Sequence, residues 1–259
     1  MEDTVAKQGE KSATYDITNF TIREMTGCGK VMRTMNDGAS SMEEVAGRIV
    51  RYLYDTLVDG QTGMRACSLV RFFKTHTFEQ LEDELKTFAV NMLGDTPVST
   101  GMKCLTLLGT VGENQEWNSR RASRGHQAIP LPSENAVNEI PMMRNLIKQL
   151  GLSVSLVVKP DPALLLDMEQ KTYNVFLVPE AFGSPYIPAQ KEFVVPYGIK
   201  SVTGFGGMLP SGDVFMVIIF LKVPVSRETV DLFKSLSLNI KLAVLPFEED
   251  VFARTGKGG

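Results

Sequence analysis

One polar stretch of the chain, residues 112–132, concentrates side chains that could bind a charged ligand. It holds a tryptophan, three arginines and a histidine: Trp117, Arg120, Arg121, Arg124 and His126. Guanidinium groups bind carboxylates and phosphates through paired hydrogen bonds, and the tryptophan ring offers a stacking face. Because long loops in compact domains are often functional, we predict a ligand-binding loop here. The alternative is a solvated loop whose arginines pair with Glu113, Glu116 or Glu134.

The two histidines, His76 and His126, titrate closest to neutral pH. His126 could ligate haem or change its protonation, although a hydrogen-bonded structural histidine is the favoured interpretation. His76 directly follows a predicted strand and is expected to be a surface turn residue. The chain has three cysteines, two histidines and no CxxC pair, so the ligand spacings of a zinc site are missing. We predict no metal, and the sequence names no cofactor.

The cysteines, Cys28, Cys67 and Cys104, are widely spaced and odd in number. This usage is typical of reduced thiols in a reducing compartment and argues against a disulfide framework. Cys67 and Cys104 fall in predicted strands, where a free cysteine usually acts as a small buried hydrophobe. We therefore predict a cytoplasmic protein with structural cysteines.

Two further groups of residues could serve a ligand but also have structural explanations. Gly204, Gly206 and Gly207 could indicate phosphate binding. They lie within a predicted strand with no helix N-terminus after it, so close packing or a bulge explains them better. Phe182 and Tyr186 belong to the proline-rich segment PEAFGSPYIP. Their rings could wall a pocket, and they could equally hold the loop in place.

Composition limits the class of protein. The chain has 259 residues, 43% hydrophobic content and a net charge of -3, so it can bury a sizeable core in one large domain or two small ones. It lacks the basic excess of a dedicated nucleic-acid binder. The longest apolar run, residues 214–221, is too short to span a bilayer, and the polar N-terminus is no secretory signal. We expect neither nucleic acid nor a membrane as a partner.

Periodic segments in the first half predict the elements that position these side chains. The segments are a helix over 41–57, a strand over 66–75, a helix over 77–93 and a strand over 103–111. Ser41 and Glu44 fit a capping box at the start of the first helix. Thr77 could cap the second helix, whose apolar residues form one stripe. The two strands are apolar runs typical of a buried sheet.

The second half continues with another helical stretch and the remaining strands. Its segments are a helix over 133–150, strands over 152–158 and 172–178, a short helix or turn over 189–197, and strands over 200–209 and 213–223. Pro141 starts or kinks the helix, and Gly151 stops it. Pro210 and Gly212 occupy the second and fourth positions of a type I turn between the last two strands.

The last periodic element follows Ser226, which could cap a helix with Glu228 in its first turn. Residues 236–244 alternate as in a strand and also form a helical stripe. The cap favours the helix, although periodicity alone leaves both structures open. Such a helix would be apolar on two faces, with Leu238 and Leu242 outside the stripe. It could pack both on the sheet and on a partner subunit.

Three segments carry a resemblance to a known family: YGIKSV at 197–202, PSGDVFMVI at 210–218 and FKSLSLNIKLAV at 233–244. Together with the order of the predicted elements, they resemble the GAF domain, a sensory α/β fold related to PAS domains. The segment 41–199 is similar by element order only. CLTLLG at 104–109 and GHQAIPLP at 125–132 also resemble the sensory module found ahead of bacterial histidine kinases.

The resemblance implies a fold and a division of the chain. We expect an α/β (α+β) GAF-like domain over residues 41–247, built on a central, mainly antiparallel six-stranded sheet with helices packed on its faces. Residues 1–40 would form an N-terminal extension, partly disordered or made of short helices. Residues 248–259 would form a flexible tail.

The resemblance also implies a function, that of a cytoplasmic, non-enzymatic sensor of a small molecule. The ligand would lie in a pocket under the 112–132 and 179–188 loops, where the candidate residues named above, including Phe182 and Tyr186, would contact it. Terminal helices would form a homodimer and relay the signal to a histidine kinase or response regulator. Three alternatives stay open: a structural dimerisation or docking module without ligand, a GAF-type thiol reductase, and a haem sensor. The chain does not show the cysteine arrangement of that reductase class.

Overall fold

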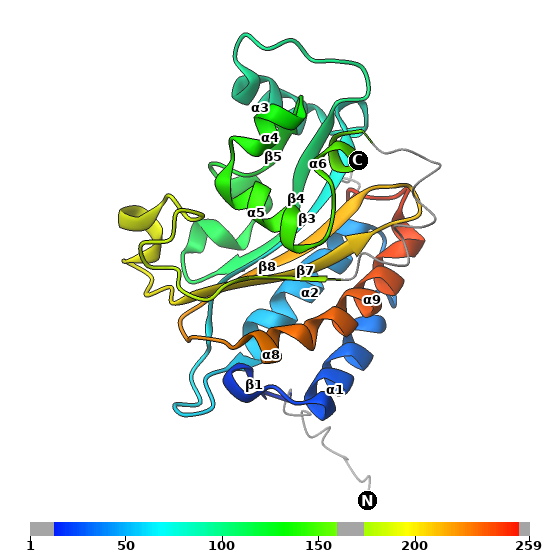
Figure 1. Ribbon diagram of the computed structural model, residues 1–259. Coiled ribbons are helices and arrows are strands. Elements are labelled where there is room, and N and C mark those ends of the chain that lie inside the picture. Colours follow the sequence, from blue (N-terminus) through cyan, green and yellow to red (C-terminus); the bar gives the residue numbers. More distant parts are fainter. Residues whose placement is uncertain (1–12, 160–173, 254–259) are drawn as a thin grey trace, which may run out of the picture.

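The computed structural model describes residues 13–159 and 174–253, and a six-stranded sheet runs through its centre (Figure 1). The strands lie in the order β5-β4-β3-β8-β7-β6, and every neighbouring pair is antiparallel. Their bounds are β3 (Cys67–Thr77), β4 (Lys103–Gly112), β5 (Ala128–Leu131), β6 (Asn174–Val178), β7 (Ser201–Met208) and β8 (Val214–Leu221). A separate parallel pair joins β1 (Tyr15–Asp16) to β2 (Leu57–Val58). The predicted fold class is confirmed.

Four helices cover one face of the sheet, below and to the right of it in Figure 1. They are α1 (Ile22–Arg33), α2 (Met42–Thr56), α8 (Arg227–Asp231) and α9 (Phe233–Val244). Their apolar side chains join those of the strands in one core, where Ile49, Phe72, Phe215 and Phe233 are fully buried. All residues of β8 are buried, because this central strand is covered on both faces.

A second core lies on the opposite face of the sheet. The elements above it are α4 (Glu134–Asn138), α5 (Pro141–Gln149), α6 (Val154–Val158) and the π-helical turn η5 (Gln190–Val194). Phe73, Phe176 and Met216 of the sheet are buried beneath them. A smaller third cluster packs α3 (Asp83–Leu93) on β5 and β4. The loops on this face leave a cavity above the central strands.

Local sequence signals explain how the elements begin and meet. Ser41 caps α2 as predicted, since its Oγ accepts a hydrogen bond from the Glu44 amide at 3.2 Å. Helix α2 lies close to β4 at Gly109, where an added Cβ would be 2.8 Å from the carbonyl oxygen of Ala46. A side chain at that position would push the helix off the sheet.

The prediction of a strand over 152–158 is wrong. Ser153 starts helix α6 instead, because its Oγ accepts a hydrogen bond from the Leu156 amide at 3.3 Å. The β-branched residues of this segment favour a strand locally, but the cap and the burial of Val157 in the second core decide for a helix. The remaining strand of the sheet is β5, which lies inside the stretch expected to be a loop. It is an edge strand with β4 as its one neighbour, and proline is tolerated in such a strand, as at Pro130.

The end of β3 also differs from the prediction. The strand continues to Thr77, so His76 lies inside it with 1% of its surface exposed. The interpretation of His76 as a surface turn residue is wrong, because the ring of Phe252 packs over it at 5.4 Å. Thr77 caps the 3-10 turn η2 (Phe78–Gln80), and α3 begins only after that turn.

The expected divisions at residues 40 and 247 do not correspond to breaks in the packing. Helix α1 has a capping box at Thr21 and Glu24, and its Met32 is fully buried in the same core as α2. After α9, the chain returns to the start of α2, where the Met42 amide donates to the carbonyl oxygen of Asp250 at 3.0 Å. Residues 1–12 of the expected extension and 254–259 of the expected tail lie outside the described residues.

The last element is helical, as the cap of Ser226 predicted. Ile240 and Val244 of α9 are fully buried, whereas Leu238 and Leu242 are 44% and 41% exposed. Helix α9 therefore has apolar side chains on two faces. Within residues 13–159 and 174–253, no helix combines the length and apolar character required to cross a bilayer.

Candidate functional site

A cavity of about 340 Å³ opens on the second-core side of the sheet. Strands β3 and β8 form its floor, and the segments before β5 and around η5 form its walls. The residues that matter most for its chemistry are Arg71, Trp117, Ser123, Arg124, His126 and Phe193. A largely apolar hollow with a few convergent polar groups is typical of a small-molecule site. The cavity lies under both loops that the sequence analysis singled out.

Arg71 forms the polar part of the floor. It lies in the middle of β3, paired in register with Thr110 of β4 and Ile218 of β8. The residue is 9% exposed, and its Nε is buried without a hydrogen-bond partner in residues 13–159 and 174–253. No described carboxylate forms an ion pair with it. Burial lowers the pKa of Arg71 to about 10, so the guanidinium still carries its charge at neutral pH.

Aromatic rings form one wall of the cavity. Trp117 meets Phe193 edge to face at 5.4 Å, and Phe193 meets Phe220 of the floor at 4.9 Å. The indole lies directly on the backbone of β4, because a Cβ at Gly112 would be 2.6 Å from it. Asn114 also ties this turn to the segment after η5 through a hydrogen bond from its Nδ2 to Tyr197 Oη at 3.2 Å. These contacts hold the stacking face of Trp117 in a fixed position.

The opposite wall carries polar groups at different depths. Ser123 is buried, and its Oγ has no hydrogen-bond partner among the described residues. His126 is exposed, and desolvation together with the charge of Arg71 lowers its pKa to about 4. It is therefore neutral near pH 7. Arg124 is exposed and donates to Glu116 Oε1 at 2.5 Å, as the solvated-loop alternative expected.

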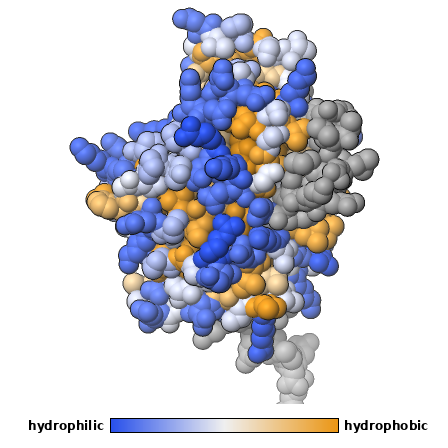
Figure 2. All heavy atoms as spheres, in the orientation of Figure 1, coloured by the Kyte–Doolittle hydropathy of each residue, from blue (hydrophilic) through white to orange (hydrophobic). Residues whose placement is uncertain are grey.

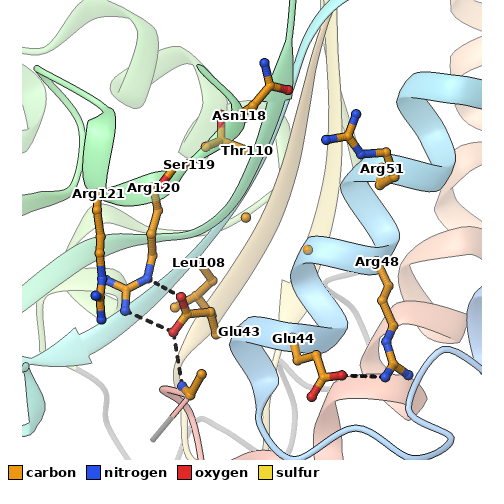
Figure 3. A pocket seen from close by; sticks show the side chains of 13 residues that line it. Glu43, Glu44, Arg48, Arg51, Leu108, Thr110, Asn118, Ser119, Arg120 and Arg121 are labelled. Carbon is orange, nitrogen blue, oxygen red and sulfur yellow. Dashed lines mark hydrogen bonds and ion pairs between the residues drawn. The ribbon is translucent and has the colours of Figure 1, made fainter. Parts of the chain in front are cut away.

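Arg120 and Arg121 line a different groove, between α2 and the 3-10 turns η3 (Gln115–Asn118) and η4 (Arg120–Ala122) (Figure 3). Figure 3 shows the Arg120 guanidinium turned toward Glu43 of α2. Its Nε and Nη2 donate to the two Glu43 oxygens at 2.6 and 2.9 Å, and Nη2 also reaches Glu82 at 2.7 Å. Its side chain is 5% exposed, so Arg120 joins three elements and is not available to a ligand in the cavity.

Arg121 is half exposed, and its Nε lies 4.0 Å from a Glu84 oxygen. Phe182 and Tyr186 contribute to a third depression, between α5 and the loop after β6. Phe182 is 67% exposed, whereas Tyr186 packs partly against the second core. Of the seven candidate residues, the structure therefore brings Trp117, Arg124 and His126 into the cavity and places the other four outside it.

Arg71, Ser123 and Phe193 are cavity residues that the sequence analysis did not single out, and Arg71 is the charged one. A signal for it was present, since ACSLVRFFKT places an arginine inside a strand that is otherwise apolar at that point. A charged residue in a central strand is rarely buried without a structural partner or a ligand. Recognising it as a site residue requires knowing that neither neighbouring strand supplies a carboxylate.

The cysteines lie away from the cavity. Cys28, Cys67 and Cys104 are free and buried, in α1, β3 and β4 respectively. Burial raises the pKa of Cys28 and of Cys104 to about 12, and raises that of Cys67 as well. Their thiols are therefore protonated and poor nucleophiles at neutral pH. In the part of the chain that the structure describes, no group of three histidine, cysteine or acidic residues could hold a metal ion.

No protein-family model and no curated protein sequence matches this chain. Solved structures do match it, at low identity. The free methionine-R-sulfoxide reductase of Neisseria meningitidis, solved with its substrate, is 9% identical with a TM-score of 0.50, over 93% of this chain and 99% of that chain. A GAF domain from a Coxiella burnetii phosphoenolpyruvate-protein phosphotransferase is 12% identical with a TM-score of 0.41, over 87% and 94%. The phycocyanobilin-bound GAF domain of a cyanobacterial phytochrome is 8% identical with a TM-score of 0.41, over 87% and 96%.

These likenesses concern the fold. The chain has a GAF-like fold, as its sequence resemblance predicted: an antiparallel six-stranded sheet with α1, α2 and α9 on one face and loops over a cavity on the other. A fold of this kind does not define an activity. The function has to be argued from the cavity itself.

Proposed function

We propose that the protein is a cytoplasmic, non-enzymatic sensor domain that binds a small molecule in the cavity between β3, β8 and the covering loops. One observation carries the proposal: the cavity contains a buried arginine, Arg71, whose charge has no partner in the part of the chain that the structure describes. An unpaired buried charge destabilises a fold unless a ligand completes it. Packing alone gives no reason to keep such a residue in a central strand.

The chemistry of the other groups supports binding over catalysis. The nucleophile of a thiol reductase must be an accessible thiolate, and the three cysteines are buried with raised pKa values. None of them lines the cavity. His126 is neutral and Trp117 is held rigidly, so both suit recognition of a bound molecule. Reduced buried thiols are also in keeping with a cytoplasmic location.

The proposal is tested by filling the cavity. Ser123→Leu replaces a buried hydroxyl that lacks a hydrogen-bond partner with an apolar side chain of greater volume. The dialysable fraction of a bacterial cell extract should raise the thermal midpoint of the wild-type protein, with stabilisation of about 2.7 kcal/mol at a ligand concentration about 100-fold above Kd. The midpoint of Ser123→Leu should not respond. Native mass spectrometry of the wild-type sample should show the added mass.

Ser119→Leu is the matched control, because Ser119 lines the groove of Figure 3 and not the cavity. It should respond to the extract as the wild-type protein does. Equal responses of all three proteins, or no response by any of them, would favour a structural docking module whose interior needs no ligand.

We further propose that the sensor is a homodimer that contacts its second copy through α9. Leu238 and Leu242 lie one helical turn apart on the outer face of α9, opposite the buried Phe233 and Ile240. Figure 2 shows apolar areas at the surface over the half of the molecule that α1 and α9 cover. A ligand that prefers one of two arrangements of these helices would change the dimer and so signal to a histidine kinase or response regulator.

Two substitutions that introduce negative charge test the dimer. The double substitution Leu238→Glu and Leu242→Glu should convert the protein to a monomer in native mass spectrometry and light scattering. The free energy of unfolding of each chain should change by less than about 1 kcal/mol, because both side chains are exposed. Val90→Glu changes a similarly exposed residue of α3 and should leave the dimer intact. A double variant that dimerises like the wild-type protein would contradict the use of this face.

A further inference from the structure

The cavity has an uneven distribution of charge. Its lining includes two arginines and two glutamates: Arg71, Arg124, Glu116 and Glu192. Glu116 already accepts a hydrogen bond from Arg124 at 2.5 Å, and both of these side chains are largely exposed. Glu192 is exposed on η5. The floor therefore holds one positive charge, Arg71, that no described group neutralises.

The polar atoms around Arg71 are also unsatisfied. Nε of Arg71 and Oγ of Ser123, which both belong to the cavity lining, are buried without a hydrogen-bond partner among the described residues. Leu69, two residues before Arg71 on the same face of β3, is apolar. So are their partners on β8, Phe220 and Ile218. A fork of guanidinium donors thus faces a hollow whose other floor residues are hydrocarbon.

We propose that the ligand of this cavity carries one carboxylate on an aromatic or apolar body, and that Arg71 binds the carboxylate through paired hydrogen bonds. The inference rests on the proposed sensor function and names its ligand class. The guanidinium matches a carboxylate in geometry and in charge. The rings of Trp117, Phe193 and Phe220 would pack against the body of the ligand.

The charge at the walls selects against phosphate esters. A phosphate carries close to two negative charges at neutral pH, and Arg71 is the one arginine of the lining without a carboxylate partner. Glu116 and Glu192 would repel the second charge. Gly204, Gly206 and Gly207, which could have indicated phosphate binding, lie in strand β7 and do not line the cavity.

The test compares carboxylic acids with neutral molecules of the same shape. The probes are phenylacetate and indole-3-acetate, each paired with its amide, and the proteins are wild type, Arg71→Met and the exposed-arginine control Arg121→Met. Calorimetry should show that wild type and Arg121→Met bind at least one acid and neither amide. Arg71→Met should bind that acid about 30-fold more weakly or not at all.

The same variant has a second readout that needs no ligand. Removal of an unpaired buried charge should raise the thermal midpoint of ligand-free Arg71→Met by about 2–4 °C relative to wild type. If Arg71 instead stabilised the fold, its replacement by methionine would lower the thermal midpoint. A lower midpoint, equal binding of acids and amides, or acid binding that survives Arg71→Met would overturn the assignment of Arg71 as a carboxylate ligand.

The outcomes also separate this inference from the sensor proposal. If an amide binds in wild type and Ser123→Leu abolishes that binding, the cavity is a ligand site and the carboxylate class is wrong. If neither the probes nor the dialysable extract bind to the wild-type protein, the sensor function and the ligand class both fail.

Discussion

Asp213→Asn should lower the free energy of unfolding by about 3–5 kcal/mol, which is a large part of the total stability of a domain. Asp213 lies immediately before β8 and is 4% exposed. Its two oxygens accept hydrogen bonds from Lys74 Nζ at 2.8 Å and Lys103 Nζ at 2.7 Å. Thr75 Oγ1 donates to the same carboxylate at 3.2 Å. The substitution would leave two buried ammonium groups without an anion.

The charges at this end of the sheet depend on one another. Burial alone would raise the pKa of Asp213, but Lys74 and Lys103 outweigh it and lower that pKa. Among the described residues, neither lysine forms an ion pair with a carboxylate other than Asp213. The nearby Glu248 accepts a hydrogen bond from the Ser211 amide. The neutral amide of asparagine therefore cannot replace the carboxylate.

Chemical denaturation followed by circular dichroism measures the effect. Asp55→Asn is the matched control, because its ion pair with Arg65 is 45% exposed on both sides and should be worth less than about 1 kcal/mol. The triple variant Lys74→Met, Lys103→Met, Asp213→Leu should regain most of the lost stability, since no charge stays buried. If Asp213→Asn costs no more than Asp55→Asn, the three charged groups do not form a coupled buried cluster.

Most strands of the sheet could be predicted from the sequence, because apolar runs and turn residues are local patterns that mark where a strand lies and where it ends. The segment from 213 to 223 is apolar over a length that fits a strand, and the turn before it has glycine where a type I turn allows it. The structure places that turn as expected, with the Gly212 amide donating to the carbonyl oxygen of Leu209 at 2.9 Å. The prediction of a helix after Ser226 is also confirmed. Its N-cap is a local hydrogen bond, from the Thr229 amide to Ser226 Oγ, and it distinguishes helix from strand where periodicity does not.

The two errors in the strands have one physical cause. Val154, Val157 and Val158 favour a strand by local preference, while Pro130 argues against one. Tertiary contacts reversed both preferences, since α6 packs on the second core and β5 needs only one neighbour, β4. An edge position removes the penalty for proline, and no sequence pattern identifies an edge in advance.

The candidate site could be predicted only in part, because its residues come from two kinds of element. The loop residues Trp117, Arg124 and His126 stood out by composition and lie at the cavity. Arg120 stood out in the same way but pairs with Glu43 and Glu82, which lie far from it in the sequence. Arg71 did not stand out, because it lies within a strand whose neighbouring residues are mostly apolar. Whether an arginine meets a carboxylate or a cavity depends on the fold and cannot be read from spacing.

His76 should make the fold sensitive to moderate acid. Neither of its ring nitrogens has a hydrogen-bond partner among the described residues, and it is 1% exposed. Desolvation, with repulsion from Lys74, lowers its pKa to about 3, against about 6.5 in the unfolded chain. The unfolded state therefore binds the proton more readily, so this contribution to stability is complete above about pH 6.5 and is lost as the pH falls toward 3.

The expected loss from His76 is about 2 kcal/mol between about pH 7.5 and pH 5, a window above the range in which most carboxylates titrate. Denaturant unfolding of wild type and His76→Phe at these two pH values measures it, because phenylalanine keeps the packing against Phe252 without a titrating group. The free energy of unfolding of His76→Phe should fall less over this interval, by nearly that amount. His126→Gln removes the separate contribution of the other histidine, whose pKa is also lowered, to about 4, and should keep the loss that comes from His76. Parallel pH dependence of wild type and His76→Phe would show that His76 accepts its proton equally well in the folded and unfolded chain, and that its burial has no energetic consequence in acid.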